Sequence, residues 1–482
     1  MTNHFPTVII GAGPTGLSAA YHTAGEYLLL DKNDRVGGAC RSAQRDGFIF
    51  DYPGDITLTT EPYARQLTAS LLDDNMHFQP RQAWIYSNAG YSPYPFRANT
   101  HDLPEEVARE CMLGLLEAHQ RWPDGARGAA NLEEFIYRHL GAGIAKQFMI
   151  PYNSKVWTVP LTMMTHDWTG SPMPISEFEY VIDGALGMDH EEHMGLRPTS
   201  RFFYPLRGGM QALMDAFLPQ IREPRVNSRV TNIDVARRAV TVNGQEEVGY
   251  DRLITTIPLP ELAKLVPEMP RNVREAIGGL INVPVYCIHL GVDRPKITDK
   301  HWIYYPESEF VMQRIFVQSN ASPFTRPEGT SSLTLEISYS PYKPVSPDGL
   351  IERGIADTIK AGLLKPEDRI LVAELRSRDY AYVVYTHERP RQVALALDWL
   401  HQHDIYPAGR FATWEYLNFE GTLLAGKTVA AQANATARTP VGRMTVPTVP
   451  VVPNRQPPGS VRGTDGPTSD QRGAPDADHL HR

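Results

Sequence analysis

The sequence predicts an α/β fold built on a parallel sheet, with an inserted helical subdomain and a second, mostly antiparallel β-sheet domain. Three observations carry this prediction. Thr7 to Ile10 is a short β-branched apolar run that ends in a glycine-rich turn, and a helical stretch of small residues follows. Apolar residues between about Leu103 and Met149 recur at helical spacing. The runs Val283 to Val292 and Ser331 to Ser340 have the composition of strands.

A G-x-G-x-x-G motif, made of Gly11, Gly13 and Gly16, follows the first strand directly. Its glycines permit a tight turn, the close approach of a pyrophosphate and close packing of the next helix. A second apolar run ends on Asp31, which would accept a hydrogen bond from a ribose hydroxyl. This order of strand, glycine turn, helix, strand and acid predicts a Rossmann-like dinucleotide-binding domain. The alternative is a strand-to-helix turn that holds no ligand.

A second glycine pair, Gly37-Gly38, follows shortly after Asp31, and Arg41 comes three residues later. This arrangement resembles flavoproteins such as amine oxidases and protoporphyrinogen oxidases. The resemblance favours FAD over NAD as the dinucleotide.

Later segments suggest how the chain is divided. The turn Val242-Asn243-Gly244 is a hairpin signal, Tyr250 to Ile257 would return the chain to the parallel sheet, and Gly426 to Ala437 would form a helix beside the first glycine loop. The last segment, residues 439–482, contains eight prolines and almost no aromatic residues, which predicts a disordered tail. We therefore expect a dinucleotide-binding domain of residues 1–90, 195–275 and 395–438, a helical subdomain 100–194, an antiparallel sheet domain for the substrate 276–394, and a tail 439–482.

Composition restricts the classes of partner. The net charge of −8 argues against a broad nucleic-acid or anionic-membrane surface. The three cysteines, Cys40, Cys111 and Cys287, have no C-x-x-C spacing, so neither a disulfide framework nor a thiolate zinc site is expected. There is no signal-peptide pattern and no run of about 18 apolar residues. We therefore expect a soluble, cytoplasmic protein, and the sequence leaves its oligomeric state open.

Several further segments resemble the UDP-galactopyranose mutases, most closely the eukaryotic type, over about residues 7–437. They fall in the same order as in that family and are Tyr94-Pro95-Phe96, Pro151 to Trp157, Arg207-Gly208-Gly209, Trp302-Ile303-Tyr304, Arg314, Ser319-Asn320, Tyr382, and Gly409-Arg410-Phe411 through Tyr416.

The resemblance implies an isomerase that interconverts the pyranose and furanose forms of a nucleoside-diphosphate hexose such as a galactose, through attack of the N5 atom of reduced FAD on the anomeric carbon. It also implies roles for individual residues. The base would be contacted by Tyr94, Phe96 and Phe148; the sugar nucleotide and its diphosphate by Asn153, Trp157, Tyr304, Arg314, Tyr382 and Tyr416; and the dinucleotide by Gly208, Gly209 and Arg410, in addition to the two glycine loops. For any single tyrosine the alternative is core packing, and for Arg207-Gly208-Gly209 it is a simple turn.

Two departures from the family concern charge. The family has a Gly-Gly-His loop beside the flavin, where this chain has Pro53-Gly54-Asp55, and it has an arginine after a Trp-x-Gly, where Trp168-Thr169-Gly170 precedes Ser171-Pro172. A carboxylate near the flavin disfavours the anionic reduced form. Both changes make the site more negative, which predicts a requirement for a divalent cation such as Mg²⁺ or Mn²⁺ and a dispensable flavin.

Asp55 is the first candidate ligand for such a cation, and it also joins the candidate catalytic residues. A second candidate is the pair His190 and His193, which are three residues apart and can share a helical face. The alternative for the histidine pair is a charged turn in solvent.

A third departure concerns the base. The glutamine that reads uracil in the family is replaced by Arg97. An arginine matches the O6 and N7 acceptors of guanine, so we predict a GDP-sugar such as GDP-galactose, leading to galactofuranose, over a UDP-sugar. The alternatives are a surface arginine or one that contacts a phosphate.

Two other functions remain open from the sequence. The glycine motifs also fit an FAD-dependent oxidoreductase of the amine-oxidase type, and Leu417 to Gly421 departs from the residues that related flavoproteins have before the last helix. The altered loop at Asp55 also fits a binding protein that has lost catalysis.

Overall fold

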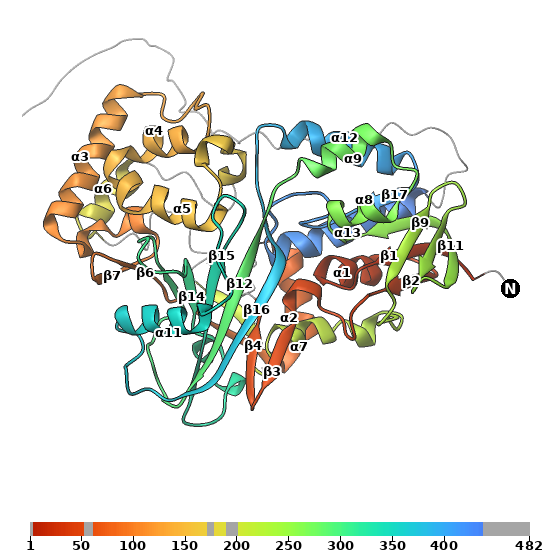
Figure 1. The fold of residues 1–482 in the computed structure, drawn as a ribbon, viewed down its shortest axis with the longest axis horizontal. Coiled ribbons are helices and arrows are strands. Elements are labelled where there is room, and N and C mark those ends of the chain that lie inside the picture. Colours follow the sequence, from red (N-terminus) through yellow and green to blue (C-terminus); the bar gives the residue numbers. More distant parts are fainter. Residues whose placement is uncertain (1–2, 53–60, 171–177, 189–200, 437–482) are drawn as a thin grey trace, which may run out of the picture. The chain divides into compact units, whose positions relative to one another are not determined.

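The computed structural model describes residues 3–52, 61–170, 178–188 and 201–436. Its first sheet contains β1, which ends directly before the glycine motif (Figure 1). The strand order is β2-β1-β11-β10-β9, and β17 pairs with β11. Strands β2, β1, β11 and β17 are parallel, whereas β10 is antiparallel to both β11 and β9. Their bounds are β1 His4–Ile10, β2 Tyr27–Leu30, β9 Val230–Asp234, β10 Ala239–Val242, β11 Glu246–Thr255 and β17 Ile405–Pro407.

Both faces of the first sheet are buried. Ile9 belongs to the core that contains residues of α1 and α13, whereas Val8 and Ile10 belong to the core that contains residues of α8, α9 and α12. This alternation follows from the two-residue period of a strand, and a run that is apolar on both faces is typical of a parallel sheet. The helices are α1 Pro14–His22, α8 Leu259–Leu265, α9 Arg271–Gly278, α12 Arg389–His401 and α13 Phe419–Thr436.

The second sheet has the strand order β16-β12-β15-β14-β13-β6-β7. Its neighbours are antiparallel except for β6 and β13, which run parallel. The bounds are β6 Ala83–Ser87, β7 Gly90–Pro93, β12 Asn282–Val292, β13 Trp302–Tyr304, β14 Arg314–Phe316, β15 Ser331–Ser338 and β16 Ile370–Val383.

The two faces of this sheet differ in chemistry. On β15, Leu333, Leu335 and Ile337 pack in the core that contains residues of α11 (Leu350–Lys360). The alternate residues of β15 point to the opposite face, and they are polar yet fully buried: Ser332, Thr334, Glu336 and Ser338. A buried polar sheet face requires partners for its side chains, so it marks a region with a specific role.

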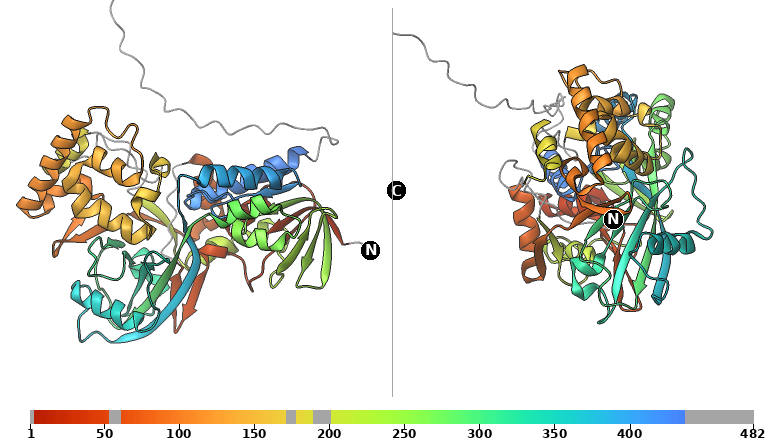
Figure 2. Two further views of the ribbon diagram at one scale, coloured as in Figure 1. Left: turned by 45° about the horizontal axis from the view of Figure 1, so that its top comes forward. Right: turned by 90° about the vertical axis from the view of Figure 1, so that its left-hand side faces the viewer.

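Helices α3 Glu105–Arg121, α4 Leu132–Ile144, α5 Ile150–Trp157 and α6 Phe178–Ala185 form a separate helical group (Figure 2). A single π-helical turn, Ala145–Met149, connects α4 to α5. Such turns occur frequently at functional sites, and this one carries Phe148 and places Asn153 and Trp157 on the next helix.

The remaining elements of the described chain include two small antiparallel pairs and several short helices. The pairs are β3 Ser42–Arg45 with β4 Phe48–Asp51, and β5 Met76–Pro80 with β8 Arg201–Pro205. The helices are α2 Pro62–Leu72, α7 Met210–Asp215, α10 Gln318–Ala321 and the one-turn helix Gly38–Cys40. All three cysteines are buried, and no disulfide joins them.

The sequence placed the main elements well. The predicted strands at residues 283–292 and 331–340 appear as β12 and β15, and Asn243 and Gly244 have positive φ angles of 52° and 72° in the predicted hairpin turn. The last helix begins at Phe419, earlier than expected. The fold is therefore the predicted α/β class.

One assignment differs from the expected division. Residues 83–93 form β6 and β7 of the second sheet, although we had placed residues 1–90 in the first domain. A strand pattern shows that a segment pairs, but it does not show with which sheet. Residues 1–438 form one compact unit, so the boundaries between the three expected parts stay a prediction. The predicted tail, residues 439–482, lies outside the described residues.

Candidate functional site

The first glycine loop is closely packed and leaves the start of α1 open. The Gly11 N–H donates to the Leu30 carbonyl at 2.8 Å, and Gly11 has a φ of 96°. A Cβ on Gly16 would lie 1.8 Å from the Gly11 carbonyl oxygen, so this position requires glycine. Gly13 precedes α1, and no side chain caps the helix. The N–H groups of the first turn are therefore available to an anion.

The second glycine pair lies directly against the first loop. The Gly37 N–H donates to the Ala12 carbonyl at 2.8 Å. A Cβ on Gly38 would lie 2.8 Å from the Cα of Gly13. Both glycine loops therefore present backbone, without side chains, to one cavity. Arg41 lies at the edge, where its Nε donates to the Gly38 carbonyl at 3.3 Å.

The Asp31 carboxylate supports the same loop. Its Oδ2 accepts from the Ala12 N–H at 2.7 Å, and its Oδ1 accepts from the backbone N–H and the side-chain amide of Asn33, both at 2.8 Å. A carboxylate has about four acceptor positions, so one remains for a ribose hydroxyl.

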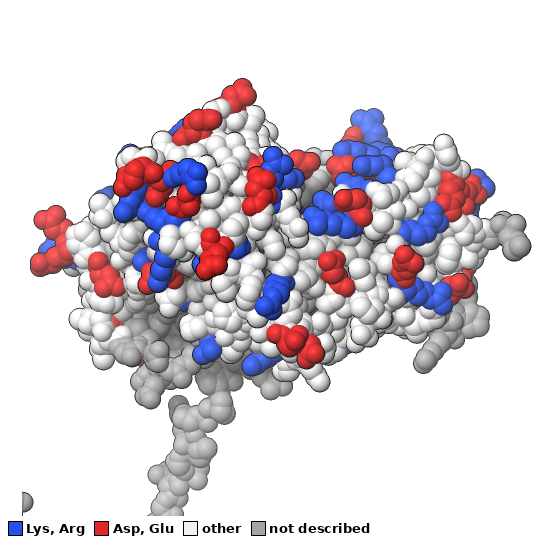
Figure 3. Space-filling model, turned by 90° about the horizontal axis from the view of Figure 1, so that it is seen from below, with Lys and Arg blue, Asp and Glu red and all other residues white. Residues whose placement is uncertain are grey.

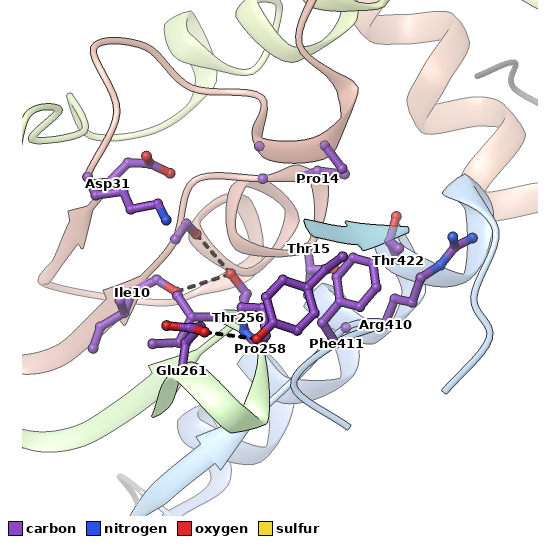
Figure 4. A pocket seen from close by; sticks show the side chains of 18 of the residues that line it. Ile10, Pro14, Thr15, Asp31, Thr256, Pro258, Glu261, Arg410, Phe411 and Thr422 are labelled. Carbon is purple, nitrogen blue, oxygen red and sulfur yellow. Dashed lines mark hydrogen bonds between the residues drawn. The ribbon is translucent and has the colours of Figure 1, made fainter. Parts of the chain in front are cut away.

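These elements enclose a cavity of about 370 Å³. Figure 4 shows Asp31 on one side of it and Arg410 with Thr422 on the other, with Pro258 and Phe411 between them. Thr256 also lines the cavity, and its hydroxyl donates to the carbonyls of Ile10 and Gly11, at 3.1 and 3.2 Å. An acid for a ribose, bare backbone for a pyrophosphate and apolar walls fit a dinucleotide.

Two of the expected dinucleotide contacts are occupied within the protein. Arg410 donates to the carbonyls of Leu417 and Ala381. A Cβ on Gly209 would lie 2.6 Å from the Oγ of Ser42, so Gly209 packs against the β3–β4 pair, whereas a Cβ on Gly208 would lie 2.9 Å from the Cβ of Ala212. In the described residues, the glycine pair at 208–209 does not line the cavity.

A stack of aromatic rings brings together the residues predicted to contact a base. Tyr94 and Tyr304 stack with centroids 5.0 Å apart, and Tyr152 meets Tyr304 edge-on at 5.5 Å. Tyr152 stacks on Phe148, which stacks on Phe96, at 5.1 and 5.2 Å. Sequence reasoning had given Tyr152 no role, although its helix carried the motif.

A second group of rings adjoins this stack. Trp157 lies 5.9 Å from both Tyr382 and Tyr416, and these two tyrosines are parallel at 6.2 Å. The Trp157 Nε1 donates to the Asn153 Oδ1 at 3.1 Å. Tyr152 is close enough to Tyr382 and to Arg314 for both to influence its pKa, so it adjoins both groups.

Three buried tyrosines of this region, Tyr152, Tyr382 and Tyr94, are neutral. Burial raises the pKa of Tyr152 well above its usual range, and Tyr304 raises it further. Burial also raises the pKa of Tyr382 and of Tyr94. These phenols can therefore donate hydrogen bonds to an anion without carrying a charge.

Arg314 forms a buried fork with Glu336. Its Nη2 donates to both carboxylate oxygens at 2.7 and 2.8 Å, and its Nε donates at 3.1 Å. The Glu336 side chain is fully buried, whereas that of Arg314 is 21% exposed. Adjacent strands set this pair, because residues 314 and 336 are directly opposite in β14 and β15. Sequence reasoning missed Glu336; its signal was a single acid in a buried strand.

Arg97 is also buried, near helices α4 and α6. Burial lowers the pKa of His139, and the Arg97 guanidinium lowers it further. Burial raises the pKa of Tyr180, and Arg97 opposes that shift. Its charge also acts on Tyr94 of the base stack. Arg97 is therefore close to both the stack and the helical group.

The metal candidates lie outside the described residues: Asp55, His190 and His193 are all in segments that the structure does not describe, as are Ser171 and Pro172. Among residues 3–52, 61–170, 178–188 and 201–436, no three His, Cys, Asp or Glu side chains cluster in a way that could hold a metal ion.

In the described residues no helix combines the length and apolarity needed to cross a bilayer. On the face seen in Figure 3, acidic and basic side chains are interspersed.

Comparison with known proteins assigns the fold. A family model described as flavin containing amine oxidoreductase matches residues 14–434. Among solved structures, a reduced UDP-galactopyranose mutase is 29% identical, with a TM-score of 0.84, covering 90% of this chain and 96% of that one.

Two relatives identified by sequence have lower identity to this chain than the mutase has. The chain is 22% identical to protoporphyrinogen oxidase 2 of Arabidopsis thaliana over 288 residues, 52% of this chain and 57% of that protein, so it spans less than two thirds of that relative. It is 22% identical to a coproporphyrinogen III oxidase of Bacillus subtilis over 366 residues, 68% of this chain and 76% of the relative. The cavity and its glycine loops fit the FAD that this fold holds.

Proposed function

This chain belongs to the family of flavin-containing amine oxidoreductases, and we propose that it is an isomerase within that family. It would interconvert the pyranose and furanose forms of a nucleoside-diphosphate hexose. The observation that carries the proposal is the grouping of Tyr304, Arg314 and Tyr382 with the base stack and Trp157. Segments far apart in the sequence supply these residues. The similarity to a UDP-galactopyranose mutase over most of both chains supports the same function.

Gly11, Gly13, Asp31 and Gly38 would hold FAD, with the pyrophosphate against bare backbone and the ribose on Asp31. When bound in its reduced form, FAD supplies a nucleophilic nitrogen for the anomeric carbon. Because the ring form changes without net oxidation, the reaction returns the cofactor to its starting state.

The residues of this chain would then bind and orient the substrate. The base would lie on the aromatic rings of Tyr94 and its neighbours, because every base offers a π-face for stacking. Neutral phenols and Arg314 would donate hydrogen bonds to the diphosphate, and a guanidinium offers a planar fork for phosphate oxygens. Trp157 and the buried rings around it would keep water away from the anomeric carbon.

Arg314 has little net charge to offer the diphosphate, since Glu336 neutralises it. This balance suits an isomerase, because the nucleoside diphosphate must leave and then recombine with the sugar. A site with a large excess of positive charge would retain the free diphosphate.

For the base, we propose guanine over uracil on the strength of Arg97, whose guanidinium matches two guanine acceptors. The influence of Arg97 on the pKa of Tyr94, a residue of the base stack, supports this choice. Calorimetry with GDP and UDP tests it: we expect tighter binding of GDP, and UDP binding at least as tightly would contradict it. The variant Arg97→Gln should reduce the preference.

Metal dependence without flavin is the other form of this proposal. Its support is sequence alone, through Asp55 and the missing arginine after Trp168, and the well-formed cavity favours FAD instead. An absorbance spectrum of the purified protein, followed by metal analysis of the same sample, separates the two. Flavin bands support the FAD route, whereas a colourless protein that is inactivated by a chelator and restored by Mn²⁺ supports the metal route.

An FAD-dependent oxidoreductase of the amine-oxidase type is the second candidate function. The family match and the two porphyrinogen oxidase relatives favour it. An oxidase consumes an electron acceptor in a fixed ratio to the product that it forms. Oxygen uptake that matches product formation would select this function over the isomerase.

The direct test of the isomerase is product analysis. Purified protein is incubated with GDP- and UDP-hexoses, separately with dithionite-reduced FAD and with Mn²⁺ plus a chelator control. We expect the furanose form to appear in the NMR spectrum of the sugar. Absence of ring interconversion with every substrate and cofactor would contradict the proposal.

A further inference from the structure

Arg81 lies in the two-residue connection between β5 and β6, and its backbone is fixed beside β13. The Gln82 carbonyl accepts from the N–H groups of His301 and Trp302 at 2.7 and 3.0 Å. The Gln82 N–H donates in turn to the Nδ1 of His301 at 3.0 Å. These three hydrogen bonds determine where the Arg81 side chain begins.

The Arg81 guanidinium lies among the residues of the base stack. Its central carbon is 5.4 Å from the centroid of Tyr94 and 5.7 Å from that of Trp302. Its Nη2 donates to the Tyr304 hydroxyl at 2.9 Å. The Arg81 Nε is buried and has no hydrogen-bond partner in the described part of the chain. A buried donor that lacks a partner indicates a missing acceptor.

No carboxylate among the described residues pairs with the charge of Arg81. None of the ion pairs formed among the described residues includes Arg81, in contrast to Arg314, whose Nε and Nη2 both bind Glu336. The Tyr304 hydroxyl accepts a hydrogen bond from Arg81, and Tyr304 is directly opposite Arg314 in the antiparallel pair of β13 and β14. The phenol of Tyr304 therefore lies between a neutralised guanidinium and an uncompensated one.

We propose that Arg81 binds the diphosphate of the substrate and supplies the positive charge that Arg314 lacks. The inference rests on the proposed function, since it assumes a nucleoside diphosphate in this site. Arg314 retains two N–H groups on Nη1 that no residue of the described chain accepts. With Arg81 on the other side of Tyr304, a diphosphate would receive donors from two guanidinium groups and the phenol between them.

The competing role for Arg81 is recognition of the base. Its position over the Tyr94 ring fits a cation that reads the acceptors of guanine. The two roles differ in a measurable way, because a phosphate contact is lost equally for every base, whereas a base contact is lost for one base only.

Calorimetric titration of the full-length protein with GDP, UDP and guanosine tests the proposal. The variants are Arg81→Gln and Arg81→Lys, and the control is Arg65→Gln. Arg65 also lies over two aromatic rings, those of Phe78 and Phe203, but outside this region. A urea unfolding curve for each variant shows whether it folds.

We expect Arg81→Gln to weaken the binding of GDP and UDP alike, by about 10- to 100-fold, because it removes hydrogen bonds from a charged donor. Guanosine, which has no phosphate, should bind as it does to the wild type. Arg81→Lys should recover part of the loss, and Arg65→Gln should bind all three ligands like the wild type.

Unchanged binding of GDP and UDP by a folded Arg81→Gln protein would overturn the inference while the proposed function stands. A loss confined to one base would overturn it in favour of base recognition. A wild-type protein that binds neither GDP nor UDP would contradict the proposed function itself.

Discussion

Replacing Glu336 with glutamine should lower stability and raise affinity for a nucleoside diphosphate at the same time. Glutamine has the same shape but no charge, so Arg314 would be left with an uncompensated charge. The carboxylate accepts three hydrogen bonds from Arg314 at 2.7, 2.8 and 3.1 Å, and its side chain is fully buried. The change therefore removes one charge and leaves the packing unaltered.

The expected cost follows from this burial. Breaking a buried ion pair by removing one partner costs about 3–5 kcal/mol. Because glutamine keeps one carbonyl oxygen as an acceptor for Nη2, we expect the lower end, about 3 kcal/mol. In the same variant a negative charge disappears beside the proposed diphosphate. A unit charge within about 8 Å is worth about 2 kcal/mol at an effective dielectric constant of 20, so GDP should bind at least about tenfold tighter.

Urea unfolding and calorimetry measure the two effects. The matched control is Glu309→Gln, which breaks the exposed pair between Glu309 and Lys360. Exposed pairs contribute little, so the control should unfold and bind like the wild type. If Glu336→Gln unfolds at the same urea concentration as the wild type, the pair does not hold the site in the way we describe. If stability falls but affinity also falls, Glu336 shapes the site and does not set its charge.

Three further results are expected. Gly13→Ala should fold, because the added Cβ would meet its nearest atom at an ordinary 3.6 Å, but it should purify without flavin absorbance; Gly278→Ala, whose Cβ would meet nothing within 4 Å, should keep the wild-type spectrum, and flavin in both proteins would contradict the assigned pyrophosphate position. Burial lowers the pKa of His301 to about 4 and of His289 to about 3, so the unfolded chain binds more protons below about pH 6.5 and stability should fall from there towards pH 4; His301→Asn should reduce the slope by about one proton, and an unchanged slope would count against a neutral His301. Tyr382→Phe should lower kcat/KM by about 10- to 100-fold in the product assay while the protein stays folded, because one neutral donor is lost; full activity would remove Tyr382 from the site.

The local parts of the fold could be predicted from the sequence. The turn at Gly11 and Gly16 follows from steric limits that only glycine meets. The hairpin at Asn243-Gly244 follows from the tolerance of asparagine and glycine for the positive φ angles that the turn has. Both depend on neighbouring residues alone. The expected ribose acid, Asp31, likewise stands at the end of its strand, where the carboxylate reaches the loop.

Long-range pairing could not be predicted in the same way. Residues 83–93 joined the second sheet, and no local pattern selects the partner of a strand. Glu336 meets Arg314 because β14 and β15 pair in one register, and a shift by one residue would place it on the other face. Arg81 reaches Tyr304 through the parallel pairing of β6 with β13. The charges that matter most in the site therefore became visible only in three dimensions.

The ratio of furanose formed to reducing equivalents consumed, measured in one anaerobic reaction with reduced FAD and a GDP-hexose, tests the central claim most directly. An isomerase returns its cofactor to the starting state, so we predict many molecules of furanose for each equivalent of reductant. A ratio of one, or no furanose at all, would contradict the account.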